Sequence, residues 1–229
     1  MKERIILLIF LVVIHNSLIA KKISEPTYIT SKRMEIIKQG EITSFIGDVV
    51  LTQGKSTIKS DIMKNYEKDG YVIGKGNISI VDKSQPDMTI KGYGQRIFYN
   101  KNTKYGILSG KPKVVRINNK DPNDNITITG ERIKTYLKEN KVLVEKNAYV
   151  KHSQIEATAG LIDYDFVNKK IYLEESPFVN QNTDDVNGQY WADKIEVDVE
   201  KEKIFLKGNV KATIYSQKYF NFEKDLNYK

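Results

Sequence analysis

The chain has 229 residues and carries 37 Lys and Arg against 29 Asp and Glu, a formal net charge of +8. Basic and acidic residues are interspersed along the whole length, so a basic groove for nucleic acid is not expected, although the positive charge suits an anionic ligand. The absence of cysteine excludes disulfides, thiol catalysis, cysteine-based metal sites and a lipid-modified N-terminal cysteine.

The N-terminus has the pattern of a secretory signal peptide. Lys2 and Arg4 precede the apolar run Ile5–Ile14, which polar residues 15–17 then interrupt before Ala20. An apolar helix of this length rises about 15 Å, roughly half of a bilayer core. We expect residues 1–20 to be a signal peptide cleaved after Ala20, with an uncleaved inner-membrane anchor as the alternative.

The chain after this segment has the periodicity of strands. Apolar and polar residues alternate in short runs, such as Ile126/Ile128, Val142/Val144 and Ile204/Leu206, as expected for half-buried strands. No window of a dozen residues keeps the spacing of an amphipathic helix. The sequence therefore predicts an all-β protein.

An internal repeat organises these strands. A small residue followed three places later by Met or Ile recurs at intervals of 29 to 36 residues, which is the signature of a repeat architecture. The six pairs are Ser31-Met34, Ser60-Met63, Gly94-Ile97, Gly130-Ile133, Ala159-Ile162 and Ala192-Ile195.

Each repeat continues with a polar turn and a second strand, and a bend then leads into a short third strand such as Val49–Leu51. Hairpins of this size cannot bury a face alone, so the repeats must form one continuous sheet, antiparallel because the connections are short. The turn-forming residues that mark the bends are Gly47, Gly76, Gly110, Asn147, Ser176 and Gly208.

One face of this sheet is predicted to be apolar and the other charged, because the third and fifth positions after each small residue are mainly apolar and the second and fourth are mostly charged. The result is a curved sheet or flattened roll with an apolar lining, and ordinary core packing is the alternative role for each lining residue. The predicted lining residues are Ile36, Phe45, Ile78, Ile97, Leu108, Val144, Ile162, Leu173 and Leu206.

Residues 29–63 resemble the opening of the OstA-like family of lipopolysaccharide-transport proteins. The most specific part is Phe45-Ile-Gly-Asp-Val49, followed by Thr52-Gln-Gly54 and Ile58-Lys-Ser-Asp61, and weaker similarity extends over residues 27–214. The resemblance implies a twisted, open-edged antiparallel β-jellyroll over residues 21–215, followed by a polar and aromatic tail at 216–229. It also implies that the apolar inner face holds the acyl chains of lipid A.

The resemblance further implies a non-enzymatic periplasmic carrier that moves lipopolysaccharide from the inner to the outer membrane. Its implied partners are lipopolysaccharide, the inner- and outer-membrane export components and, head to tail, further copies of itself. The alternatives are a membrane-anchored relay of the same machinery and a structural β-repeat protein. Pairing is expected through edge-strand residues Tyr28, Ile29, Val210 and Ile214.

The candidate catalytic residues do not form the arrangement of an active site. His152 is the single histidine after the signal segment, and one imidazole without suitably placed carboxylates does not make a zinc site. The pairs Glu174-Glu175 and Asp184-Asp185 are adjacent in sequence, so on a strand they point to opposite faces and cannot flank one bond.

Residues 121–125 resemble the start of a calcium-binding loop. The sixth position is Ile126 instead of Gly and the twelfth is Arg132 instead of Glu, so a turn is the better interpretation. No metal, cofactor or enzymatic activity is therefore expected.

Overall fold

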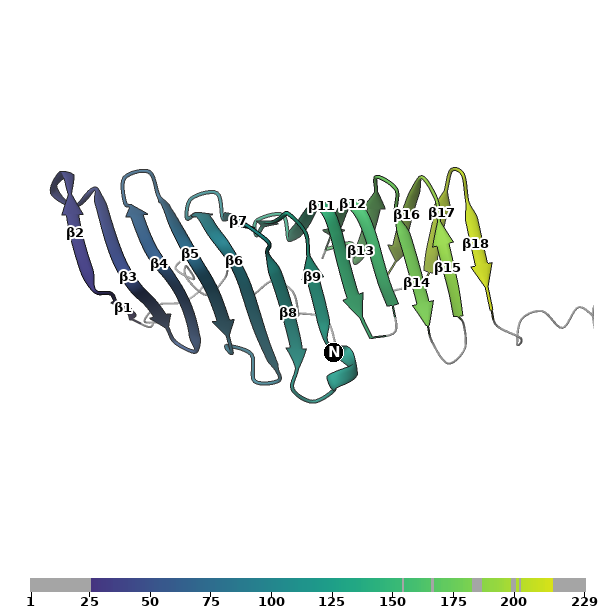
Figure 1. Ribbon diagram of the computed structural model, residues 1–229, viewed down its shortest axis with the longest axis horizontal. Helices are drawn as coiled ribbons and strands as arrows, with labels where there is room; N and C mark the ends of the chain where they lie inside the picture. Colours follow the sequence, from purple (N-terminus) through teal and green to yellow (C-terminus); the bar gives the residue numbers. More distant parts are fainter. Residues whose placement is uncertain are drawn as a thin grey trace, which may run out of the picture.

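The structure, a computed structural model, describes residues 26–153, 155–165, 167–182, 187–198, 201 and 203–215. The expected signal peptide and C-terminal tail lie outside the described residues. The described chain forms an 18-stranded sheet (Figure 1) in which all strand pairs are antiparallel. The all-β prediction is thus confirmed.

The strands are β1 (Thr27–Thr30), β2 (Arg33–Ile37), β3 (Ile42–Gln53), β4 (Ser56–Tyr66), β5 (Tyr71–Asp82), β6 (Met88–Asn100), β7 (Tyr105–Ser109), β8 (Lys113–Asn118), β9 (Ile126–Thr129), β10 (Arg132–Tyr136), β11 (Lys141–His152), β12 (Ile155–Asp165), β13 (Lys170–Glu174), β14 (Phe178–Asn182), β15 (Asn187–Trp191), β16 (Lys194–Asp198), β17 (Lys203–Lys207) and β18 (Lys211–Ile214). The short 3-10 helices η2 (Lys38–Gly40) and η3 (Pro122–Asp124) lie in connections.

In the orientation of Figure 1, the sheet has an upper half, which includes β2 and β7, and a lower half, which includes β1 and β8. The long strands β3, β4, β5, β6, β11 and β12 run through both halves, whereas elsewhere two short strands share the place of one long strand. For example, β6 pairs with β7 in the upper half and with β8 in the lower half. The first strand position of the sheet is likewise divided into β1 and β2, which both pair with β3.

A bend joins the two halves in every repeat. Each bend contains two consecutive residues with positive φ, and at Lys146-Asn147 they oppose the single residue Gly160 of the next strand. Such a two-against-one β-bulge bends a strand and increases its twist. The paired residues are Gly47-Asp48, Gly76-Asn77, Gly110-Lys111, Lys146-Asn147, Glu175-Ser176 and Gly208-Asn209, which include all six turn formers named from the sequence.

A polar side chain from the residue 16 positions earlier ties several of these bends. Asn77 Nδ2 donates to Asp61 Oδ2 over 3.0 Å, and Asn209 Nδ2 donates to Asp193 Oδ2 over the same distance. At the first bend, Lys32 Nζ lies 2.8 Å from Asp48 Oδ2. The corner is thus a repeated local unit in which the residue after each small residue contacts the bulge.

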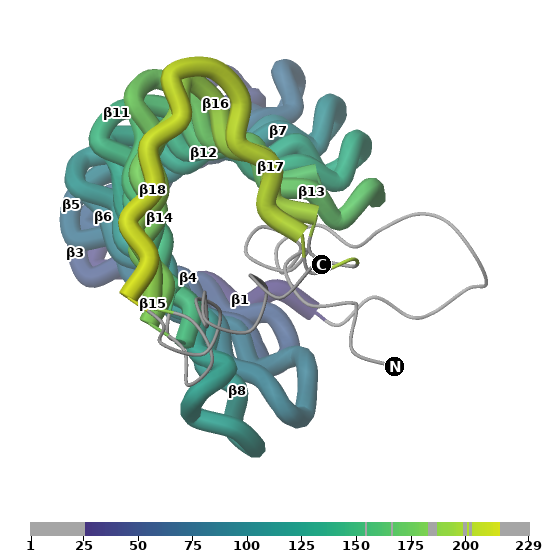
Figure 2. Tube along the Cα trace, turned by 90° about the vertical axis from the view of Figure 1, so that its right-hand side faces the viewer, coloured from purple at the N-terminus to yellow at the C-terminus, as the bar shows by residue number. Residues whose placement is uncertain are grey.

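Because every repeat bends in the same sense, the sheet curls and its two halves face each other across the interior (Figure 2). Fully buried side chains from the upper half, such as Leu108 and Leu173, share one hydrophobic core with Ile80 and Val114 of the lower half. The result is a flattened roll that is longest across its strands.

The roll ends in two edges that have no further strand among the described residues. At one edge β1 and β2 pair only with β3, and at the other β17 pairs only with β16 and β18 only with β15. Each edge leaves a row of backbone N–H and C=O groups available for another strand.

Candidate functional site

An apolar row crosses the whole upper half on the inner face. Its members are direct cross-strand partners from β2 to β17, so that Met34 opposes Phe45 at one end and Ile195 opposes Leu206 at the other. In order the row is Met34, Phe45, Met63, Gly74, Ile97, Leu108, Ile133, Val144, Ile162, Leu173, Ile195 and Leu206.

A second apolar row crosses the lower half in the same way. It begins on β1 and ends on β18, again with one residue from each successive strand. In order the row is Ile29, Leu51, Ile58, Ile80, Gly92, Val114, Ile128, Val150, Ala157, Val179, Tyr190 and Ala212.

The structure places all nine predicted lining residues on this inner face. Ile36 follows Met34 by two positions on β2, and Ile78 precedes Ile80 by two on β5, so both share the face of their rows. The other seven, Phe45, Ile97, Leu108, Val144, Ile162, Leu173 and Leu206, belong to the upper row.

The nine lining residues predicted from the sequence include none of the lower row, and of that row only Ile29 was named as a site residue, for edge pairing. The signal of the lower row was present in the short third strand of each repeat, where Val49–Leu51 and Ile78–Ile80 alternate with period two. These runs are short and lie after the bend, so their face cannot be assigned until the bulge is known.

The inner face is closed in the middle of the roll and exposed toward its ends. Leu108 and Leu173 are 0% and 1% exposed, because the opposite half of the sheet covers them. Met34 and Ile36 near the first edge are 53% and 64% exposed, and Ile214 near the last edge is 41% exposed. An apolar ligand therefore meets accessible side chains first at the two edges.

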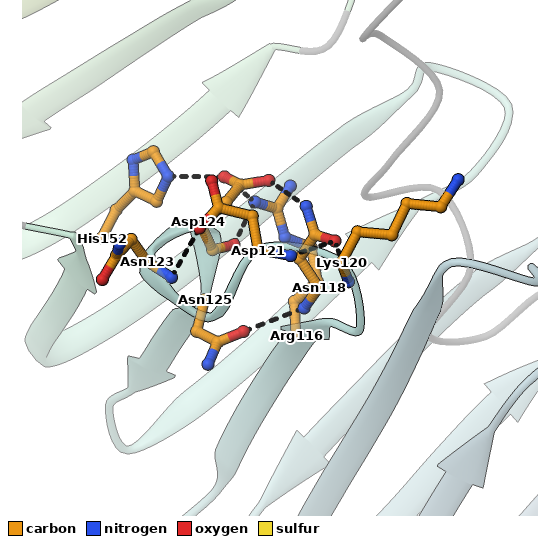
Figure 3. A network of polar contacts seen from close by, with 8 residues as sticks. All are labelled: Arg116, Asn118, Lys120, Asp121, Asn123, Asp124, Asn125 and His152. Atoms are coloured by element: carbon orange, nitrogen blue, oxygen red, sulfur yellow. Dashed lines mark hydrogen bonds and ion pairs between the residues drawn. The ribbon is translucent and has the colours of Figure 1, made fainter.

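A polar network ties the connection between β8 and β9 to the rim of the lower half (Figure 3). Asp124 of η3 lies 2.6 Å from Arg116 Nη2 and 2.8 Å from His152 Nε2, and its other oxygen accepts a bond of 2.9 Å from Asn118 Nδ2. Burial by itself would raise the pKa of Asp124, but the hydrogen bonds from Asn118 and His152 and the charge of Arg116 outweigh it and lower that pKa. The network anchors a loop and includes no serine or cysteine nucleophile.

The other candidate chemical groups also lie in structural roles. Asp121 caps η3 by accepting a bond of 3.0 Å from the Asn123 N–H, which makes the calcium-like segment a turn. Glu174 pairs with Lys194 over 2.7 Å, whereas Glu175 lies in a bend. The pair at 184–185 lies outside the described residues, and in the described part of the chain no group of acidic residues, histidine or cysteine could hold a metal ion.

Within the described ranges, no helix is long and apolar enough to span a bilayer.

Comparison with known families gives the fold a context. Residues 28–141 match the model of the family described as "LptA/(LptD N-terminal domain) LPS transport protein". The chain belongs to this family. In this OstA-like member the matched segment runs from β1 to the start of β11, and the two apolar rows continue beyond it in unbroken register to β17 and β18.

A solved structure similar to this OstA-like chain is that of LptH from Pseudomonas aeruginosa, described as the LptA homologous periplasmic component of the lipopolysaccharide transport device. The two share 21% sequence identity over 53% of this chain and 83% of that chain, with a TM-score of 0.45. No curated protein matches the chain. The protein is thus a member of a lipopolysaccharide-transport family by its match over residues 28–141.

Proposed function

We propose that this protein is a non-enzymatic periplasmic carrier that shelters the acyl chains of lipopolysaccharide on its inner face and passes the lipid toward the outer membrane. The observation that carries the proposal is the pair of apolar rows, which run in register from one open edge of the roll to the other. A lipid can therefore move along the roll without leaving an apolar surface.

The energetics of lipid transfer favour such a surface. Burial of one acyl chain of about a dozen carbons is worth on the order of 10 kcal/mol at about 0.8 kcal/mol per methylene. A lipid with several chains cannot cross an aqueous compartment at a useful rate unless these chains stay covered. Since the centre of the roll is closed by contact between its halves, acyl chains enter at an exposed edge and separate the two rows as they advance.

The open edges supply the connection to neighbouring components. An unpaired edge strand adds a strand from another protein through backbone hydrogen bonds. Tyr28 is 66% exposed and Ile214 41% exposed at opposite edges, and Val210, which precedes β18, is 53% exposed. Ile29 begins the lower apolar row. Docking at either edge would extend the inner apolar face into the next protein, whether an export component or a second copy of this chain.

Photo-crosslinking tests the proposal directly. We would place a photoreactive residue at Phe45, Ile97 or Leu173 of the upper row in cells that make lipopolysaccharide. The controls are Lys64, Lys134 and Glu196, which lie on the outer face of the sheet on strands β4, β10 and β16. Cross-links to lipopolysaccharide from the inner set alone are expected. Equal labelling of both sets, or none from either set in folded protein, contradicts the carrier.

A membrane-anchored relay of the same machinery is the second candidate. It requires that the apolar run Ile5–Ile14 stays attached as an anchor, which its short length and the polar residues 15–17 disfavour. N-terminal sequencing of protein from an osmotic-shock fraction separates the two. A chain that begins just after Ala20 supports the soluble carrier, and an intact Met1 in the membrane pellet supports the relay.

A further inference from the structure

The outer face of the N-terminal repeats carries a group of basic residues beside the bends. Lys75 and Arg96 are direct cross-strand partners on β5 and β6, both exposed. Across the bend, Lys59 and Lys113 lie in one cross-strand row with Tyr93. We call these five residues, Lys59, Lys75, Tyr93, Arg96 and Lys113, the basic ridge.

The basic side chains of the ridge form no direct ion pairs among the described residues. The nearby Asp61 is bonded to Asn77 of its own bend. Like charges placed directly opposite each other on a sheet destabilise it. The juxtaposition of Lys75 and Arg96 is therefore a cost to the fold that a bound anion would remove.

Several outer lysines of the later repeats form ion pairs, unlike those of the ridge. Lys146 lies 3.8 Å from Glu131, Lys194 lies 2.7 Å from Glu174, and Lys134 is bonded to Glu145. These three lysines each have a glutamate partner, whereas the four basic side chains of the ridge have none among the described residues. The ridge is a local feature and does not merely follow from the net charge of +8.

The shape of this surface limits what can cover it. The ridge flanks the bends at Gly76-Asn77 and Gly110-Lys111, on the outer, convex side of the curl seen in Figure 2. A convex surface makes contact with an extended plane more readily than with a small molecule, which needs a concave site. Tyr93, 41% exposed among the basic residues, has the amphipathic ring that is favoured at a membrane–water interface.

We propose that the basic ridge docks this protein onto an anionic phospholipid surface, so that the roll lies against a membrane while its inner face remains available for acyl chains. Lysine and arginine near an anionic bilayer are attracted to its surface charge, and the tyrosine ring lies at the headgroup level. This role is independent of the carrier function, since the ridge and the apolar rows lie on opposite faces of the sheet.

Vesicle flotation with the full protein recovered from its own periplasm tests the ridge. The probes are vesicles of phosphatidylcholine alone and vesicles in which about 30% of the lipid is phosphatidylglycerol. We expect binding only to the anionic vesicles, weakening as salt is raised because surface charges are screened. The double variant Lys75→Ala/Arg96→Ala should lower partitioning about thirtyfold at low salt, from the attraction of two basic residues to an anionic surface.

The matched control is Lys146→Ala/Lys194→Ala, which removes the same charge from paired, exposed lysines of the C-terminal repeats. It should change partitioning less than about threefold, because paired surface charges contribute little. An equal loss in both variants, or no preference of the unaltered protein for anionic vesicles, overturns the proposal. Binding of the protein to an acidic polypeptide, without binding to anionic vesicles, also overturns the proposal. Cross-linking of lipopolysaccharide at Ile97 should be unchanged in the ridge variant, which separates this test from that of the carrier.

Discussion

Leu108 and Ile36 lie on the same inner face but in different surroundings. Leu108 is 0% exposed between Ile97 and Ile133 in the middle of the upper row, whereas Ile36 is 64% exposed at the first edge. The first side chain serves packing in the closed roll, and the second is available to a ligand. Position along the row thus decides whether an apolar side chain is packed or accessible while the roll is closed.

Alanine substitutions should separate these two roles. Leu108→Ala should lower the free energy of unfolding by about 2–5 kcal/mol because it leaves a cavity in a packed core. Ile36→Ala should cost no more than about 0.5 kcal/mol because the side chain is exposed, yet reduce the lipopolysaccharide that copurifies. Urea denaturation and lipid analysis give the two values. Similar costs of unfolding at both positions would show that the first edge is covered in solution.

Asp165 shows how a turn carboxylate links stability to pH. Its Oδ1 accepts bonds of 3.0 Å from the N–H groups of Val167 and Asn168, and Asn168 Nδ2 donates to Oδ2 over 2.8 Å. The backbone N–H of Asn168 is the largest cause that lowers the pKa of Asp165, and the net shift is downward. The charged form is therefore the one that stabilises the folded turn.

The pH dependence follows from this direction. A lowered pKa in the folded state means that the stabilisation is complete above the unfolded value of about 4 and is lost as pH falls through the folded pKa. Asp165→Asn keeps an acceptor but removes the charge, so its urea midpoint should lie below that of the unaltered protein at pH 7 and approach it in acid. The control is Asn100, an uncharged residue that accepts equivalent bonds in its own turn. Asn100→Ala should lower the urea midpoint by the same amount at both pH values. If the urea midpoint of Asp165→Asn still lies well below that of the unaltered protein in acid, the charge of Asp165 does not stabilise the turn as inferred.

The element that repeats most faithfully is the bend with its two left-handed residues. Gly76 has φ +73°, and a Cβ added there would lie 2.1 Å from Asp61 Oδ2. Asp61 cannot withdraw without losing its bonds to Asn77. Glycine is therefore required at this position both for its backbone conformation and for the close approach of a neighbouring strand.

A pair of glycine substitutions separates the effect of the close contact with Asp61 from that of the left-handed backbone conformation. Gly76→Ala should lower the free energy of unfolding by about 2–4 kcal/mol, from left-handed strain and the displaced carboxylate. Gly40 also has a positive φ, +99°, but its added Cβ would have nothing within 4 Å, so Gly40→Ala should cost only the backbone strain of about 1–2 kcal/mol. Thermal and urea unfolding measure both. If both variants lose the same free energy of unfolding, Asp61 and Asn77 can move aside at no cost.

At the scale of the whole molecule, the two open edges are where the proposed partners would pair with the roll. The N–H of Tyr215 donates to Asn187 O over 2.8 Å, and antiparallel pairing alternates the direction of these groups from one residue to the next. Thr213 therefore points its N–H inward to β15, while Ala212 points its N–H to the open edge.

Proline at these two positions should have opposite effects. Ala212→Pro removes a donor that only an added strand would use, so it should reduce concentration-dependent association in light scattering with little effect on folding. Thr213→Pro removes a ladder bond to β15 and should destabilise the last strand itself. Association that Ala212→Pro leaves unchanged, or a strict monomer at high concentration before any substitution, argues against assembly through β18.

The sequence by itself determined the all-β class, the six repeats, the bend positions and the residues of the upper row, because strand alternation and turn chemistry act over a few neighbouring residues. It did not reveal the lower row or the corner contacts such as Asp61 with Asn77. It also did not show that Asp124 joins Arg116 and His152.

Only the tertiary structure decided these features, since they depend on how successive bulges set the register and curl the sheet. The same curl buries Leu108 completely while Ile36 stays 64% exposed, although the sequence predicts both on the apolar face. Exposure in this protein is therefore a property of a residue's distance from an edge of the roll, and local sequence does not encode that distance.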